Sequence, residues 1–89
     1  MKAFITVIGK DKVGIIAQVS GLLAAEKINI EDISQTILAG QFTMIMAVSF
    51  SEGAKSFDEI ARLLKEKGES MDLEISIRHM AIFEAMHRI

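Results

Sequence analysis

Hydrophobic residues recur along this chain with two different spacings, which divide it into six segments. Four segments have the apolar composition or the alternation of β-strands: residues 2–8, 28–38, 41–50 and 71–78. Two segments have apolar side chains every three to four residues, as on one face of a helix: residues 14–27 and the stretch from Ser56 to Gly68. The predicted order is strand, helix, strand, strand, helix, strand.

Turn and capping residues mark the ends of these segments. The dipeptide Ala39-Gly40 predicts a tight hairpin between two strands. Earlier, the apolar phase of the second strand shifts by one residue, so we expect a bulge or bend near Glu31-Asp32. Ser56 and Glu59 have the spacing of a capping box at the start of the second helix. We expect Gly68 to end that helix.

The pattern of the later strands predicts how the sheet is assembled. Residues 41–50 are apolar on one face and only weakly polar on the other, which favours a central strand covered on both faces. Residues 71–78 alternate strictly and fit an edge position. Right-handed crossovers place both helices on the same side of the sheet. We therefore predict an α+β fold: a ferredoxin-like βαββαβ sandwich, with an antiparallel four-stranded sheet, two helices on one face and a short C-terminal helix.

Composition narrows the class of protein. The chain has 89 residues, which suffices for one domain. Its residues are 51% hydrophobic and its mean hydropathy is +0.37, so we expect a surface that self-associates. A net charge of −2 without a basic patch argues against nucleic acid as a partner. Cysteine is absent, and no apolar run is long enough to span a membrane or to form a signal peptide. We expect a cytoplasmic protein with no membrane partner.

The candidate chemistry lies in residues 8–16, where a strand turns through a polar, glycine-bounded loop into a helix. Backbone N–H groups at a helix start lack intrahelical partners, and the positive end of the helix dipole lies behind them. Such a turn suits a small anion. Asp11 is placed to cap the first turn, and Gly14 lets another backbone or a ligand approach closely. The alternative is a capped turn that only joins strand and helix.

The chain resembles the ACT domain, a small-molecule-sensing module of amino-acid metabolism, in two motifs: Asp11-Lys12-Val13-Gly14-Ile15 after the first strand and Ile28-Asn29-Ile30 at the start of the second. The resemblance covers nearly the whole chain. The first half is especially similar to the ACT domain of the glycine cleavage system repressor and to bacterial proteins that consist of a single ACT domain. What it implies is a regulatory domain that dimerises, not an enzyme.

The resemblance also implies a ligand site between two domains, which touches the first strand–helix loop of one and the start of the second strand of the other. The residues carried over are Asp11, Val13, Gly14 and Ile15 in the loop and Asn29 and Ile30 on the strand. Backbone N–H groups suit a carboxylate, and Asp11 or the Asn29 amide oxygen can accept from an ammonium group. Some serine-binding relatives have a histidine in place of Gly9 and an asparagine in place of Asp11. Asn29 has an alternative role as a turn residue that bonds the backbone.

The C-terminal residues form a separate expectation. We assign residues 1–80 to the ACT domain and residues 81–89 to a helical tail with an apolar stripe of Ile82, Phe83, Met86 and Ile89. A helix of this length is not stable alone and must dock. We expect it to support dimer formation, and the alternative is docking on its own domain.

Two functional hypotheses remain. The first is a homodimeric regulatory module that binds an amino acid or a similar small metabolite. The second is an interaction protein that binds no ligand and docks on a metabolic enzyme or regulator. No cofactor is expected, and His79 and His87 do not suggest a metal site because no third ligand is in view. A nucleophile with its activating base is also missing from the sequence pattern.

Overall fold

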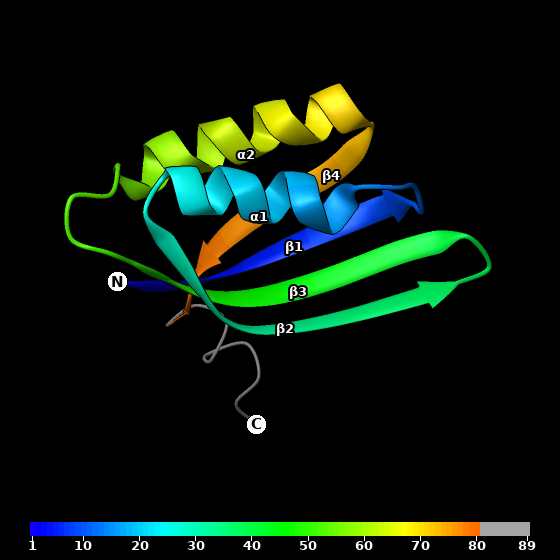
Figure 1. Ribbon diagram of the computed structural model, residues 1–89, viewed down its shortest axis with the longest axis horizontal. Helices are drawn as coiled ribbons and strands as arrows, with labels where there is room; N and C mark the ends of the chain where they lie inside the picture. The colour runs from blue at the N-terminus through cyan, green and yellow to red at the C-terminus, as the bar shows by residue number, and fades with distance from the viewer. Residues whose placement is uncertain (81–89) are drawn as a thin grey trace.

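The computed structural model describes residues 1–80, which form one antiparallel sheet covered by two helices (Figure 1). The elements follow in the order β1 (Lys2–Lys10), α1 (Ile15–Ala25), β2 (Ile28–Leu38), β3 (Gln41–Phe50), α2 (Phe57–Met71) and β4 (Leu73–His79). The strand order across the sheet is β2-β3-β1-β4, and every neighbouring pair is antiparallel. This is the predicted ferredoxin-like βαββαβ fold. The predicted C-terminal helix lies outside the described residues.

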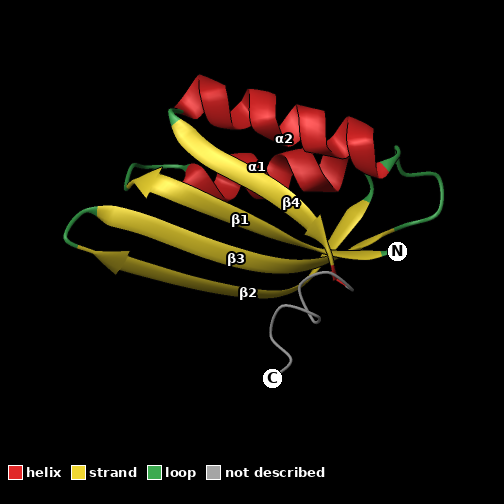
Figure 2. Cartoon of the chain, turned by 180° about the vertical axis from the view of Figure 1, so that it is seen from behind, coloured by secondary structure: helices red, strands yellow, loops and turns green. Residues whose placement is uncertain are grey.

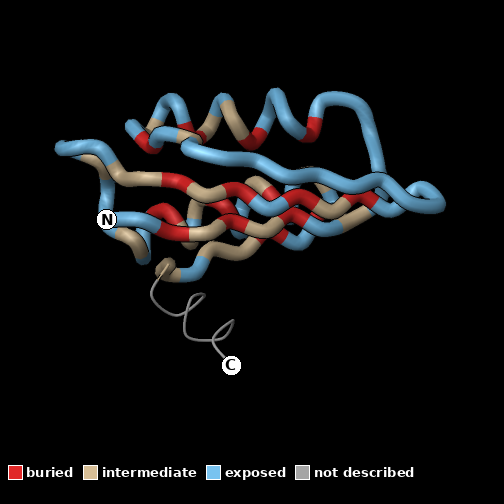
Figure 3. The backbone as a smooth tube through the Cα atoms, turned by 90° about the horizontal axis from the view of Figure 1, so that it is seen from below, coloured by how far each residue is buried: buried red, intermediate tan, exposed pale blue. Residues whose placement is uncertain are grey.

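Both helices lie on the same face of the sheet, and the other face is open in the described part of the chain (Figure 2). Alternate residues of the central strands β1 and β3 point under the helices, where Ile5 and Met44 are fully buried. Val19 of α1 and Leu64 of α2 close this core from above. The buried segments therefore form one layer between the sheet and the helices (Figure 3).

The turns of the β2–β3 hairpin agree with the sequence pattern. Ala39 and Gly40 both have positive φ, 52° and 79°, as a tight two-residue hairpin turn requires. The register between β2 and β3 shifts between Ile30 and Asp32, which confirms the predicted bulge. Beyond the bulge, Ile33 and Ile37 face the helix side of the sheet, because they pair with residues that point there. The bulge thus keeps the apolar side of β2 on the core side.

The positions of β3 and β4 in the sheet are also confirmed. β3 lies between β1 and β2, and β4 is an edge strand. The second face of β3, however, is not covered within residues 1–80, where Ile45 keeps 37% of its surface exposed. α2 begins as predicted, because the Ser56 hydroxyl accepts from the Glu59 N–H at 3.3 Å and also donates to the Glu59 carboxylate at 3.1 Å.

The predicted end of α2 at Gly68 is wrong. The helix continues for three more residues to Met71 and ends at Asp72, which has a φ of 56°. Gly68 is buried, and a Cβ atom there would lie 2.6 Å from the Leu73 carbonyl oxygen and 3.1 Å from Ile75 Cγ1. The glycine therefore allows α2 to approach β4 closely, and this tertiary contact outweighs its weak helix propensity.

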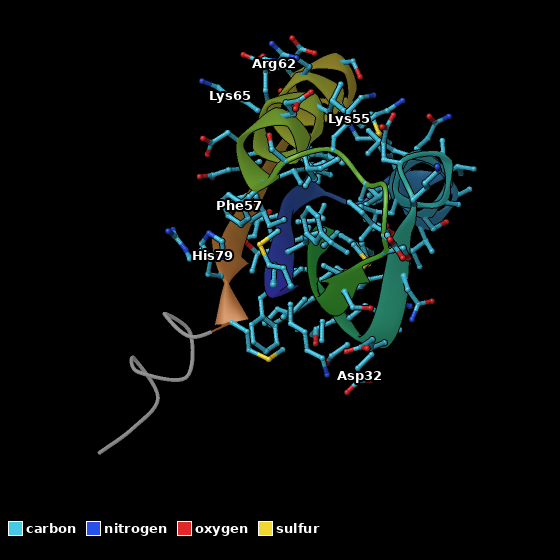
Figure 4. All side chains as sticks on the ribbon, turned by 90° about the vertical axis from the view of Figure 1, so that its left-hand side faces the viewer. Asp32, Lys55, Phe57, Arg62, Lys65 and His79 are labelled. Carbon is cyan, nitrogen blue, oxygen red and sulfur yellow. The ribbon has the colours of Figure 1, made fainter. Side chains whose placement is uncertain are left out.

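Among residues 1–80, neither helix is long and apolar enough to cross a membrane. His79 stacks on Phe57 with 3.9 Å between the ring centroids, and both residues lie at the end of the molecule that faces the viewer in Figure 4. Within the same residues, no three side chains of His, Asp or Glu come together as a potential metal site.

Candidate functional site

The loop between β1 and α1 ends at Gly14, which is the N-cap residue of α1. Gly14 has a φ of 89°, in the left-handed region that favours glycine, and a Cβ atom there would meet nothing within 4 Å. No side chain caps the helix, and its first turn contains no acidic residue. The prediction that Asp11 caps α1 is therefore wrong. The cap position lies three residues after Asp11, at Gly14, which has no side chain.

Two hydrogen bonds tie this loop to distant parts of the fold. The Asp11 backbone N–H donates to the Gly40 carbonyl at 2.8 Å, which holds the loop against the β2–β3 hairpin. The Lys12 ammonium group donates to the Met71 carbonyl at the end of α2. The loop is thus anchored at two points, while the Asp11 side chain itself is exposed. The sequence pattern did not indicate either anchor, because both partners are far along the chain.

A hollow of about 190 Å³ lies between this loop, the start of α1 and the helix side of β2. It is lined by Asp11, Lys12, Gly14, Ile15, Ile16, Ala17, Gln35, Ile37 and Phe42. The sequence-predicted residues Asp11, Gly14 and Ile15 thus come together, whereas Gln35 and Ile37 were not predicted. Pockets that enclose a small ligand commonly measure about 300–1,000 Å³, so this hollow is only part of such a site.

The other predicted residues, Asn29 and Ile30, lie at the opposite end of the sheet. Asn29 is level with Ser49 of β3, which in turn is level with Lys2 at the start of β1. The loop after β1 lies at the far end, beside the β2–β3 hairpin (Figure 1). Eight residues of β2 separate the two groups, which is about 26 Å at the usual rise of a strand. Within one chain, the six predicted residues therefore do not form one site.

Between these two ends runs the free edge of β2, whose residues from Asn29 to Leu38 are almost all exposed (Figure 3). Several of its exposed side chains are apolar: Ile33 is 43% exposed, Ile37 52% and Leu38 75%. Next to them, Ile16 of α1 is 41% exposed, and Val13 at the tip of the loop is fully exposed. These five residues are called the β2-edge patch below.

Charged groups are present near both ends of this edge. At the Asn29 end, the Lys2 ammonium group lies 3.3 Å from the Glu31 carboxylate, and both side chains are partly exposed. At the loop end, Asp11 and Lys12 line the hollow. A larger hollow of about 750 Å³ lies along the last turn of α2 and β4. None of the six predicted residues lines it.

Comparison with known proteins places the chain in a family. The model of the ACT domain matches residues 2–78. A UPF0237 protein of Clostridium acetobutylicum is 55% identical over the full length of both chains. The solved structure of an ACT domain protein from Streptococcus pneumoniae is similar with a TM-score of 0.83 and 47% identity, covering 98% of each chain.

A second solved structure is more distant. It is described as a putative glycine cleavage system transcriptional repressor, and the TM-score is 0.70 at 26% identity. The match covers 86% of this chain and 44% of that one. This agrees with the resemblance that the first half of the sequence shows to the ACT domain of the glycine cleavage system repressor.

Proposed function

Because this chain belongs to the ACT domain family and is a UPF0237 protein, we propose that it is a regulatory module that binds a small amino-acid-like ligand as a homodimer. The ligand lies between the loop of residues 11–15 of one subunit and Asn29 and Ile30 of the other. The observation that carries this proposal is that these two groups lie at opposite ends of the same free edge strand, β2.

Antiparallel pairing of two β2 edges brings the groups together. In such a pair, the end of one β2 strand lies beside the start of its partner. The loop and the hairpin lie at the end of β2, and Asn29 lies at its start, so each loop meets the Asn29 end of the other subunit. A two-fold axis therefore makes two equivalent sites from groups that are far apart in one chain.

The β2-edge patch supports a second copy as the partner. Edge strands with unpaired N–H and C=O groups readily pair with another chain unless charge or shape prevents it. Ile33 and Ile37 face the helix side of β2, where a second subunit would remove them from water. α1 carries no charged residue, so its exposed flank next to β2 offers no repulsion to a symmetry-related helix.

The chemistry of the two groups fits a zwitterion. The uncapped N–H groups of the first turn of α1 and the positive end of its dipole suit a carboxylate. The exposed Asp11 carboxylate and the Asn29 amide oxygen can accept from an ammonium group. The empty space over Gly14 leaves the helix start accessible. The ligand class that satisfies all three features is a small α-amino acid or a close analogue.

A thermal-shift screen against the twenty amino acids identifies the ligand, and isothermal titration then measures its affinity. A ligand at about 100 times its dissociation constant adds about 2.7 kcal/mol to the free energy of unfolding. The chain contains no Trp or Tyr, so the screen uses a dye or calorimetric signal. If no amino acid shifts the unfolding temperature, the proposed ligand class is wrong.

A mixing experiment tests the shared site directly. One preparation carries Gly14→Leu in the loop, and the other carries Asn29→Ala on the strand. In a heterodimer of the two, one site combines both substitutions and the other is intact. Random exchange of subunits makes about half of the dimers heterodimers, each with one intact site of two. This restores about a quarter of the wild-type number of high-affinity sites per chain. A site built within a single chain would show no such recovery.

The second candidate function is an interaction protein that binds no ligand and docks on a metabolic enzyme or regulator. The small size of the hollow and the free β2 edge favour this alternative, because an edge strand can equally pair with a strand of another protein. A monomer in solution that shows no ligand-induced shift would support it over the first proposal.

A further inference from the structure

The sheet face opposite the helices, called the open face below, is a surface that the proposed function does not use. Register pairs place Ile8 of β1 and Ile45 of β3 on this face, and they are 40% and 37% exposed. Phe4 and Ala47 lie level with each other next to them and are half-buried. The hydroxyls of Thr6 and Ser76 form a hydrogen bond of 2.6 Å with each other. These side chains are neutral, so the middle of the face lacks charge.

Charged side chains surround this middle on the two outer strands. Asp32 of β2 lies at one border, and Glu74 and Arg78 of β4 lie at the other. A face with an apolar centre and a polar border is typical of a surface that another segment covers. Both helices of the described chain are on the other side of the sheet, and neither can reach it (Figure 2).

The end of the described chain lies at the border of the open face. His79, the last residue of the edge strand β4, pairs with Ala3 of β1. Met80 follows and is half-buried, and nine further residues complete the sequence. Four of these nine are large and apolar, namely Ile82, Phe83, Met86 and Ile89. At helical spacing they share one side, and Glu84, His87 and Arg88 lie on the other.

The reach of this segment matches the width of the face. Nine helical residues span about 13 Å at a rise of 1.5 Å each. The distance from β4 across β1 and β3 to β2 is three strand spacings, or about 14 Å. The apolar side chains begin two residues after Met80, so they start at the border of the open face.

We propose that residues 81–89 pack as a short amphipathic helix across the open face of their own subunit and cover Ile45 and its neighbour Ala47. This occupant is favoured over the tail of a second copy. Pairing of β2 edges, as in the proposed dimer, would extend the sheet sideways, so the open face of the partner would begin four strand spacings, about 19 Å, from the end of β4. The proposal does not depend on a ligand.

Removal of residues 81–89 is the first test. The shortened chain, residues 1–80, exposes the open face, so it binds the dye ANS several-fold more than the full chain and forms larger species in sedimentation velocity. Unchanged dye binding would overturn the proposal. Loss of the dimer without increased dye binding would also overturn it, because the tail would then lie on the partner.

Point variants keep the test independent of truncation. Phe83→Ala raises the unfolding equilibrium constant at least tenfold in urea titrations, while Glu84→Ala, on the polar side, changes it less than threefold. A double-mutant cycle then asks what Phe83 contacts. Phe83→Ala couples with Ile45→Ala on the open face and is additive with Ile37→Ala on β2. If the effect of Phe83→Ala were additive with both Ile45→Ala and Ile37→Ala, the tail would lie elsewhere.

Discussion

Gly14 determines how closely anything can approach the start of α1. Because its φ is 89° and the space beyond its Cα atom is empty, a substitution there has two separate effects. A side chain blocks the space over the first turn, and a β-carbon strains the backbone by about 1–3 kcal/mol. Asparagine tolerates positive φ better than other residues, so it separates blocking from strain.

We therefore predict that Gly14→Leu abolishes binding of the amino-acid ligand while the protein stays folded and dimeric. Gly14→Asn abolishes binding as well, with a smaller loss of stability. Isothermal titration measures binding, and urea unfolding measures the stability of each variant. Wild-type affinity in either variant would place the ligand away from the helix start.

Asn29 offers a side-chain contact, in contrast with the backbone role of the loop. The residue is exposed at the start of β2, so its replacement leaves the core intact. We predict that Asn29→Ala weakens ligand binding about ten- to a hundredfold, as expected for losing one hydrogen bond to a charged group. The circular dichroism spectrum stays that of the wild type. An unchanged affinity would mean that Asn29 acts only as a turn residue at the start of β2 and does not contact the ligand.

At the scale of elements, two glycines in helices test the difference between packing and propensity. A Cβ at Gly68 of α2 would lie 2.6 Å from the backbone oxygen of Leu73, whereas a Cβ at Gly21 of α1 would meet nothing within 4 Å. Gly68→Ala therefore lowers the free energy of unfolding by about 1–3 kcal/mol. Gly21→Ala raises it by about 0.5–1 kcal/mol. Urea unfolding of both variants measures the difference, and the same sign for both would contradict the close contact.

The two edges of the sheet provide a further prediction. Ile37→Lys on β2 places a charge in the proposed β2–β2 interface, where desolvation and the clash between symmetry-related lysines oppose pairing. We expect the dimer to weaken about a hundredfold. Glu74→Lys on the exposed edge strand β4 leaves it unchanged. Sedimentation equilibrium over a range of concentrations measures both, and equal effects would place the interface elsewhere.

At the scale of the whole molecule, 51% hydrophobic residues in a chain of 89 leave apolar groups at the β2 edge and on the open face. We predict a homodimer at micromolar concentration, with twice the 9.8 kDa mass of one chain in sedimentation equilibrium. A species of one chain mass alone would show that the β2-edge patch remains in water. Addition of the ligand strengthens the dimer, since both subunits contribute to each site.

The sequence alone determined the order of the elements, because side-chain periodicity reflects which face of each strand or helix is buried. The bulge near Asp32, the Ala39-Gly40 turn and the Ser56 capping box all depend on residues close in sequence, and all were predicted. The ACT family was also recognisable from two short motifs.

The tertiary structure alone decided the features that depend on residues far apart in the chain. α2 continues past Gly68 because β4 packs against it, and the loop after β1 is held against the β2–β3 hairpin by the hydrogen bond from the Asp11 N–H to the Gly40 carbonyl. The separation of the loop from Asn29 follows from strand pairing, which no local pattern encodes. Local patterns report burial and turn chemistry. The relative position of two residues far apart in the chain depends on long-range packing, and this packing exists only in the folded structure.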